Sequence, residues 1–402
     1  DLLAYAGAFG EALALLRTLS PAVPDRFSYA LSRGSLTVST GAIGDARQWL
    51  EEALRLRPES GLAWHSIALL VDFAHEPDLA GRLVASERAI QGAPELERAY
   101  YYYALGKMHA DLGTHGLAFA AVARAAGETK ALYPHDRAID RHAAEDAVSG
   151  YDPGRIAAFA GQQTEPTGRS IFVMGLPRSG TSLVQQVLTS HSEVSDGAEI
   201  NLLRLLVHEA GGASYPALDG YLRRHGTASL PRLWHHLLDE RFPQPGRVVD
   251  KTTDTSRKLG LVASLLPDAP LIWLRRDPLD SAWSCFRTSF MQGIRWSNDL
   301  KDIAFNFRLE DRLLAQWQRI LGERLLVVPF ETMVSEPEPW IRRIIGHCGL
   351  AEEPQVFAPH ENRSPVMTAS AMQVRRPINR QGIGSAEPYR AFLRPFVEAY
   401  YD

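Results

Sequence analysis

The stretch 171–190, IFVMGLPRSGTSLVQQVLTS, constrains the fold of this 402-residue chain more than any other segment. Apolar, partly β-branched residues lead into a glycine-containing loop, and an amphipathic helical pattern begins directly after the loop. A strand, a glycine loop and a helix N-terminus together aim backbone N–H groups and the positive end of a helix at one point. The segment therefore predicts an anion-binding loop in an α/β domain.

The loop has the spacing of a phosphate loop but lacks its lysine. Four residues separate Gly175 from Gly180, and Thr181 stands where a nucleoside-triphosphatase loop has lysine. Arg178 instead supplies a cation two residues before the second glycine. The loop is expected to bind a phosphate-like group that is not the end of ATP. An ordinary strand-to-helix turn is the alternative, but the run Pro-Arg-Ser-Gly-Thr-Ser favours the anion site.

Composition limits the partners of the chain. With 45% hydrophobic and 22% charged residues it is an ordinary globular sequence, long enough for two or three domains. A formal charge of -4 argues against nucleic acid or an anionic membrane as a general partner, so any basic site must be local.

The expected location of the chain is the cytoplasm. Its two cysteines, Cys285 and Cys348, have no paired or metal-ligand spacing, which is typical of a reducing compartment. No apolar run is long enough for a membrane span, and no signal peptide is visible. The sequence starts at Asp1 and not at methionine, which leaves the residues upstream of it open.

Residues 1–148 have the composition and periodicity of a helical domain. They are rich in Ala, Leu, Arg and Glu, and they predict helices at 46–58, 61–71 and 100–112. The best repeat unit matches the tetratricopeptide (TPR) spacing of bulky and small positions; it consists of Tyr102, Leu105, Gly106, His109, Ala118 and Ala125. We expect a TPR-like helical repeat domain, and a plain helical bundle remains the alternative.

A linker at 149–169 with one short helix is expected to join this domain to a second one at 170–402. Short apolar strands alternate there with helical stretches, at 171–175, 247–251, 271–275 and 324–330. This alternation predicts a parallel sheet covered on both faces, with ligands at the carboxyl ends of its strands. The fold class is therefore helical repeats followed by a P-loop-like α/β domain.

The segment 274–285, LRRDPLDSAWSC, is the second informative motif. A strand ends at Arg276, Asp277 and Pro278 make the turn, and Ser284 lies on the helix that follows. Arg276 can clamp a phosphate through paired charge-assisted hydrogen bonds, with the Ser284 hydroxyl as a further donor. An Arg–Asp salt bridge with serine capping is the alternative. Together with the loop at 175–182, the motif indicates one ligand with two separate phosphate groups.

These motifs, with VVDKTTD and TASAMQVRRPIN, resemble those of the sulfotransferases that use 3′-phosphoadenosine 5′-phosphosulfate (PAPS). The resemblance covers roughly residues 168–385. Within the family, the sequence resembles the bacterial branch that carries TPR repeats, and it resembles protein-tyrosine sulfotransferases at the same motifs. It implies that the loop holds the 5′-phosphosulfate, through Arg178, Ser179, Gly180, Thr181 and Ser182. It places the 3′-phosphate at Arg276 and Ser284. Arg375 and Arg376 could reach the phosphosulfate, and a solvated basic pair is the alternative.

The resemblance also implies catalytic roles. Glu199 stands at the position of the general base, Lys251 and Arg178 would stabilise developing charge, and Ser370 would position the transferring group. No metal is required where these cations supply charge, because sulfuryl transfer resembles phosphoryl transfer in needing alignment and neutralisation. His191 is a competing base, although we expect it to cap the preceding helix.

Three positions depart from the pattern of the family. Phe330 stands where relatives have tyrosine, Ser385 where they have a basic residue, and Ser192 where proline is common. Arg380 or Arg390 could compensate for Ser385. These departures concern nucleotide affinity more than the class of reaction.

The sequence therefore predicts a sulfotransferase that moves a sulfuryl group from PAPS to a hydroxyl, leaving 3′,5′-adenosine bisphosphate. The acceptor is open between a peptide tyrosine held by the helical domain and a small phenol, sugar or natural product. A homodimer formed through the helical domain is also open. Two alternatives are an ATP-dependent kinase and a non-catalytic TPR adaptor with a relic nucleotide domain.

Overall fold

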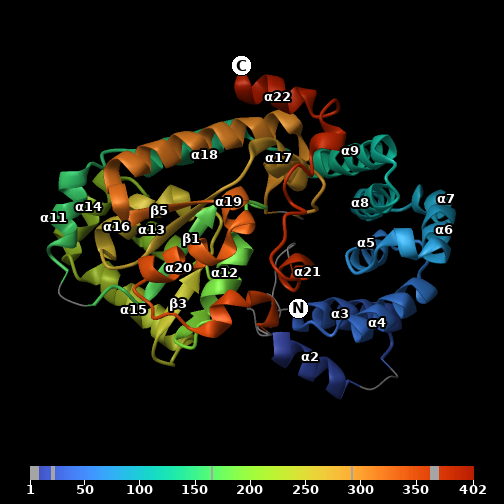
Figure 1. Ribbon diagram of the computed structural model, residues 1–402, viewed down its shortest axis with the longest axis horizontal. Helices are drawn as coiled ribbons and strands as arrows, with labels where there is room; N and C mark the ends of the chain where they lie inside the picture. The colour runs from blue at the N-terminus through green and yellow to red at the C-terminus, as the bar shows by residue number, and fades with distance from the viewer. Residues whose placement is uncertain (1–8, 20–22, 164–165, 291–292, 363–370) are drawn as a thin grey trace.

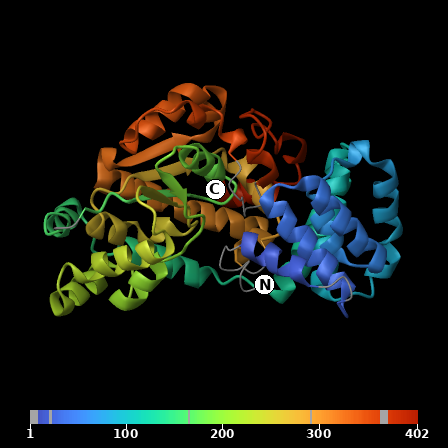
Figure 2. The ribbon, with the colours of Figure 1, turned by 90° about the horizontal axis from the view of Figure 1, so that it is seen from below.

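The computed structural model of the chain describes residues 9–19, 23–163, 166–290, 293–362 and 371–402. Figure 1 shows an arc of helices from the first third of the chain beside a part built around a sheet. Figure 2, seen from below, shows the arc to one side of the sheet-containing part.

Five parallel strands form the sheet of the described residues. The strands are β1 (Ser170–Gly175), β2 (Val194–Asp196), β3 (Arg247–Asp250), β4 (Leu271–Arg275) and β5 (Leu325–Pro329). They are hydrogen-bonded in the order β2–β3–β1–β4–β5, and every neighbouring pair is parallel. The strands β2 and β3 lie on one side of β1, and β4 and β5 lie on the other, so the strand order reverses at β1. The loop after β1 thus lies at the switch point where such sheets bind ligands.

The predicted parallel α/β sheet is confirmed, and four of its strands match the predicted ranges to within one residue at each end. The strand β2 was not predicted, because three residues carry too little of a pattern to read.

Helices cover both faces of the sheet. Phe172 and Met174 of β1 point into one core, and Ile171 and Val173 point into the other. The first core is covered by α10 (Arg137–Val148), α11 (Pro153–Ala160), α13 (Leu203–Ala210), α14 (Tyr215–His225), α15 (Ser229–Arg241), α16 (Leu259–Leu265) and α18 (Leu300–Leu321). The second is covered by α12 (Thr181–Thr189), α19 (Phe330–Ser335) and α20 (Pro337–His347).

The helical arc consists of closely packed helices. They are α2 (Phe9–Thr18), α3 (Arg26–Thr40), α4 (Ile43–Leu56), α5 (Gly61–Ala68), α6 (Pro77–Ala85), α7 (Glu87–Ile90), α8 (Glu95–Asp111) and α9 (His115–Leu132). The helices predicted at 46–58, 61–71 and 100–112 correspond to α4, α5 and α8. A Cβ on Gly106 of α8 would lie 2.6 Å from Val122 of α9, so the glycine permits close approach of the two helices. Their assignment as TPR-like repeats stays a prediction.

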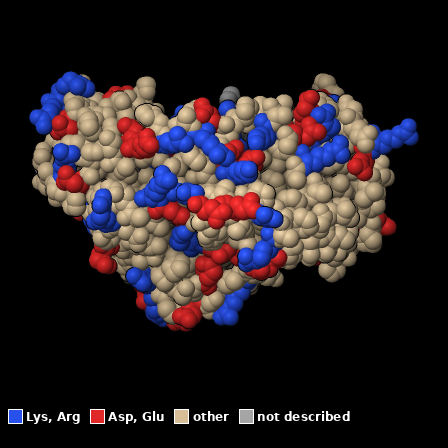
Figure 3. Space-filling model, turned by 90° about the horizontal axis from the view of Figure 1, so that it is seen from above, with Lys and Arg blue, Asp and Glu red and all other residues tan. Residues whose placement is uncertain are grey.

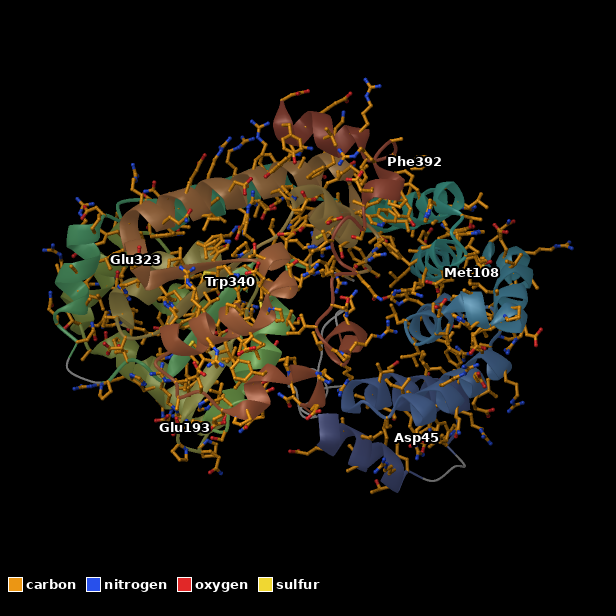
Figure 4. The ribbon with its side chains drawn as sticks, viewed as in Figure 1. Asp45, Met108, Glu193, Glu323, Trp340 and Phe392 are labelled. Atoms are coloured by element: carbon orange, nitrogen blue, oxygen red, sulfur yellow. The ribbon has the colours of Figure 1, made fainter. Side chains whose placement is uncertain are left out.

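The helical arc and the sheet-containing part share a core. Helix α17 (Pro278–Phe286) contributes Trp283, whose ring stacks on Tyr389 with centroids 3.9 Å apart. Phe119 of α9 stacks on Phe392, with centroids 5.0 Å apart. Phe392 is labelled in Figure 4, close to α9. The last helix, α22 (Arg394–Tyr401), lies against α18 in Figure 1.

Charged side chains of both signs are intermingled on the face formed by α18 and α22 (Figure 3). No helix within the described part of the chain is both long enough and apolar enough to cross a membrane.

Candidate active site

The loop between β1 and α12 has a backbone that depends on glycine. Gly180 has a φ of 103°, and a Cβ there would lie 2.5 Å from the Phe330 ring. Arg178 also has a positive φ, of 67°, which is uncommon for a residue with a side chain and is found at functional sites. The loop leads directly into the first turn of α12, whose N–H groups have no carbonyl partners within the helix.

The structure joins the two predicted phosphate motifs. The Nε of Arg178 donates a hydrogen bond to the Ser284 Oγ at 3.0 Å. The Nη1 of Arg276 donates to the backbone carbonyl of Arg178 at 2.9 Å. Residues about a hundred positions apart therefore meet at the carboxyl ends of β1 and β4.

Three guanidinium groups converge at this point. Burial, followed by repulsion from Arg287, lowers the pKa of Arg178 to about 10. Burial also lowers the pKa values of Arg276 and Arg287. Among the described residues, neither Arg276 nor Arg287 forms an ion pair with a carboxylate. The Arg276 Nε is buried and has no hydrogen-bond partner in the part of the chain that the structure describes. Cations gathered in this way favour a bound anion.

A cavity of about 280 Å³, here called the donor cavity, opens beside these residues. Most of the residues predicted to bind the nucleotide line it: Arg178, Gly180, Ser182, Arg276, Ser284 and Arg376. Ser179 and Thr181 are buried and do not line it, and the Ser179 hydroxyl has no hydrogen-bond partner within the described ranges. The backbone N–H of Ser179 donates to the Leu176 carbonyl at 3.2 Å, so Thr181 is the one of the two whose N–H would face a ligand.

Of the three positions that depart from the family pattern, Phe330 and Ser385 line the donor cavity and Ser192 does not. The Phe330 ring lies 4.9 Å from the Arg276 guanidinium, and the Arg276 Nη2 donates to the Ser385 Oγ at 3.4 Å. The two suggested substitutes lie elsewhere, because Arg380 donates to a backbone carbonyl at residue 335 and Arg390 pairs with Glu387.

The predicted base and the predicted lysine are also adjacent. The Lys251 Nζ lies 2.5 Å from the Glu199 Oε1, and the lysine side chain is 3% exposed while the glutamate side chain is 48% exposed. The N–H of Lys251 donates to the Ala198 carbonyl at 2.8 Å, which holds the end of β3 against the loop after β2. Ser370, the predicted positioning residue, lies outside the described residues.

His191 is engaged elsewhere. Its Nε2 lies 3.0 Å from the Ala351 carbonyl, and its Nδ1 accepts a hydrogen bond from the N–H of Glu193 at 3.1 Å. The side chain therefore fastens a distant loop, and the expectation that it caps the carbonyls of α12 was wrong. Both ring nitrogens are occupied, which removes it as a competing base.

Two residues of this region were not predicted from the sequence. Arg287 lines the donor cavity, and Gln373 of α21 (Ala371–Val374) accepts a hydrogen bond from the Arg178 Nη2 at 2.9 Å. Arg287 follows Ser284 by three residues, so helical spacing could have placed both on the same face. Gln373 carries no comparable signal, because its position depends on how the C-terminal segment folds back.

Across the described residues, no group of three or more His, Cys, Asp or Glu side chains is arranged to hold a metal ion.

Comparisons with known proteins find similarity to one family. Residues 170–354 match the model of the sulfotransferase family. An uncharacterised protein of Aquifex aeolicus is 26% identical over 320 residues, which are 76% of this chain and 42% of that protein. A protein-tyrosine sulfotransferase of Drosophila melanogaster is 23% identical over 230 residues, which are 53% of this chain and 46% of that protein. The chain thus covers less than half the length of both relatives.

Among solved structures, the sulfotransferase domain of the olefin synthase of Synechococcus PCC 7002 is similar, with a TM-score of 0.40 and 17% identity over 59% of this chain and 97% of that one. The sequence match at residues 170–354 is to the family that the loop motifs resemble, the sulfotransferases.

Proposed function

We propose that this chain transfers a sulfuryl group from PAPS to a hydroxyl acceptor. The observation that carries the proposal is the contact between a lysine-free phosphate loop and a second basic motif, through Arg178, Ser284 and Arg276. Two linked cation groups suit a nucleotide with phosphates at both its 3′ and 5′ positions. The match to the sulfotransferase family supports the same reading.

The residues present fit such a ligand. The first turn of α12 and Arg178 would hold the 5′ end, and Arg276 with Ser284 would hold the 3′-phosphate, with Arg376 at the rim of the donor cavity. The unpartnered Arg276 Nε is a donor that a phosphate oxygen would satisfy. PAPS, when bound, supplies a sulfuryl group carried on a phosphate that can leave.

The Glu199–Lys251 pair supplies the remaining chemistry. Glu199 takes the proton that the acceptor hydroxyl loses as its oxygen bonds to sulfur and the bond from sulfur to the phosphate oxygen breaks. Lys251 and Arg178 neutralise the charge that develops on the transferring and leaving oxygens. A buried lysine beside a half-exposed glutamate is suited to this division, because the carboxylate stays open to an incoming acceptor.

Isothermal titration of the purified chain with 3′,5′-adenosine bisphosphate and, separately, with magnesium and ATP tests the proposal. We expect binding of the bisphosphate without metal, unchanged in Arg390→Ala, whose arginine pairs with Glu387 away from the donor cavity. Magnesium-dependent binding of ATP with no binding of the bisphosphate would favour a kinase and contradict the proposal.

A further inference from the structure

A second cavity, of about 460 Å³, adjoins the first residues of the phosphate loop. Gly175, Leu176 and Pro177 line it, whereas Arg178 and the residues after it line the donor cavity. The new cavity also reaches the segment just after Lys251, at residues 253–254. We call it the α10–α18 cavity, because α18 and the segment leading into α10 form its far wall.

This placement suits an acceptor. In-line transfer needs the attacking oxygen and the leaving phosphate on opposite sides of the transferring group. The two cavities meet at the phosphate loop, between Pro177 and Arg178, and both lie at the carboxyl ends of parallel strands.

Buried polar atoms face the α10–α18 cavity without partners. The Asn306 Oδ1, the Glu310 Oε1 and the Arg257 Nε have no hydrogen-bond partner among the described residues, and Asn306 and Glu310 are 1% and 4% exposed. Asn306 and Glu310 are four residues apart on α18 and so lie on one face of it. Buried polar atoms are nearly always hydrogen-bonded in folded proteins. Two acceptors and one donor match hydroxyl groups, which can both donate and accept.

Most of the charges around this cavity are paired with one another. Arg257 contacts Glu310 at 3.4 Å, Lys258 contacts Asp254 at 2.5 Å, and His135 contacts Asp140 at 2.7 Å. The donor cavity differs, since two of its arginines have no carboxylate partner within the described residues. The α10–α18 cavity is also lined by Arg295 and Asp136, which form no ion pair among the described residues but carry opposite charges, so a ligand there needs no net charge.

Apolar side chains complete the wall. Trp296 lines the cavity and packs edge-on against Phe307 with centroids 6.0 Å apart, and Ile139 and Ile294 lie beside it. An aromatic plane next to hydrogen-bonding groups suits a ring with an apolar face and a hydroxylated rim.

We propose that the α10–α18 cavity holds the acceptor, and that the acceptor is a neutral, hydroxyl-rich molecule of the sugar class. This inference rests on the proposed sulfuryl transfer. Asn306, Glu310 and Arg257 then determine specificity through the hydroxyls that they bind, while Glu199 takes the proton.

The test uses radiolabelled PAPS with the methyl glycosides of glucose, galactose and N-acetylglucosamine, against 4-nitrophenol and a tyrosine peptide. We expect transfer to at least one glycoside. Asn306→Leu, which keeps the volume of the side chain, should raise the KM for that glycoside by about tenfold or more. Glu310→Gln should raise it as well. Arg312→Ala, an exposed position on the same helix, should leave it unchanged.

Titration with 3′,5′-adenosine bisphosphate accompanies every variant and shows that it is folded. The Kd of the bisphosphate should be unaltered in Asn306→Leu and Glu310→Gln. Bisphosphate binding by the wild type with no transfer to any of the glycosides overturns the acceptor inference and leaves the proposed function standing. Failure of the wild type to bind the bisphosphate overturns both.

Discussion

At the scale of single residues, we propose that Glu199 accepts the proton and that Lys251 neutralises the developing charge. Their side chains are 2.5 Å apart, with the lysine buried and the carboxylate half-exposed. A pair in this arrangement is stable without ligand, because each charge satisfies the other, and it can open toward an acceptor on the exposed side.

Replacing Glu199 with glutamine should remove the base while keeping the shape of the side chain. We expect kcat to fall by about 10²–10⁴-fold, the usual contribution of a positioned proton acceptor, with little change in the Kd of 3′,5′-adenosine bisphosphate. Steady-state rates with radiolabelled donor measure this. Glu193→Gln, at an exposed position just before β2, is the matched control. Full turnover by Glu199→Gln would show that another group takes the proton.

At the scale of elements, α10 is fixed to α18 by a cluster of charges. His135 contacts Asp140 and Asp302, and Arg137 contacts the same Asp302 at 2.6 Å. Burial would lower the pKa of His135, but the hydrogen bonds to Asp140 and Asp302 outweigh it and raise that pKa to about 9.

The raised pKa predicts a pH-dependent contribution to stability. Protonated His135 stabilises the fold fully below its unfolded pKa of about 6.5, and this stabilisation is lost as the pH rises through about 9. His135→Asn should therefore cost on the order of 2 kcal/mol at pH 6, allowing for solvent screening, and much less at pH 10. Urea unfolding at both pH values measures the difference. His142→Asn, on the exposed side of α10, should show no such dependence, and an equal cost for His135→Asn at both pH values would refute the assignment.

At the scale of the whole molecule, the helical arc and the sheet-containing part are built around a shared core. Phe119 of α9 contacts Phe392, and Trp283 of α17 contacts Tyr389. The C-terminal segment that carries both aromatic partners also contributes Ser385 to the donor cavity. The helical arc therefore supports the geometry of the donor cavity and is not an independent appendage.

The shared core predicts that both parts unfold together. Urea unfolding followed by tryptophan fluorescence and by far-ultraviolet circular dichroism should give coincident transitions. Phe119→Ala should shift both by about 2–4 kcal/mol, because it removes a largely enclosed aromatic ring. Separate transitions, with only the helical signal affected by Phe119→Ala, would contradict a common core.

Much of the sheet and of the donor site could be predicted from sequence, for local reasons. The strand, loop and helix around Arg178 lie in one continuous segment, and the carboxyl ends of parallel strands must share an edge, so Lys251 and Arg276 were expected near them. What depends on distant packing could not be predicted. Asn306 and the phosphate loop line the α10–α18 cavity together only because distant segments pack against each other, and no spacing in the sequence indicates that they do.

The central claim is that two linked cation groups grip the two phosphates of one nucleotide, and the Kd values of 3′,5′-adenosine bisphosphate and of adenosine 5′-phosphate test it most directly. The wild type should bind the bisphosphate at least about a hundredfold more tightly, because charge-assisted contacts to the 3′-phosphate are lost with the monophosphate. Arg276→Ala should reduce that ratio by about tenfold or more while changing the Kd of the monophosphate little. An unchanged ratio in Arg276→Ala would show that this arginine does not hold the 3′-phosphate, and the account of the donor site would be wrong.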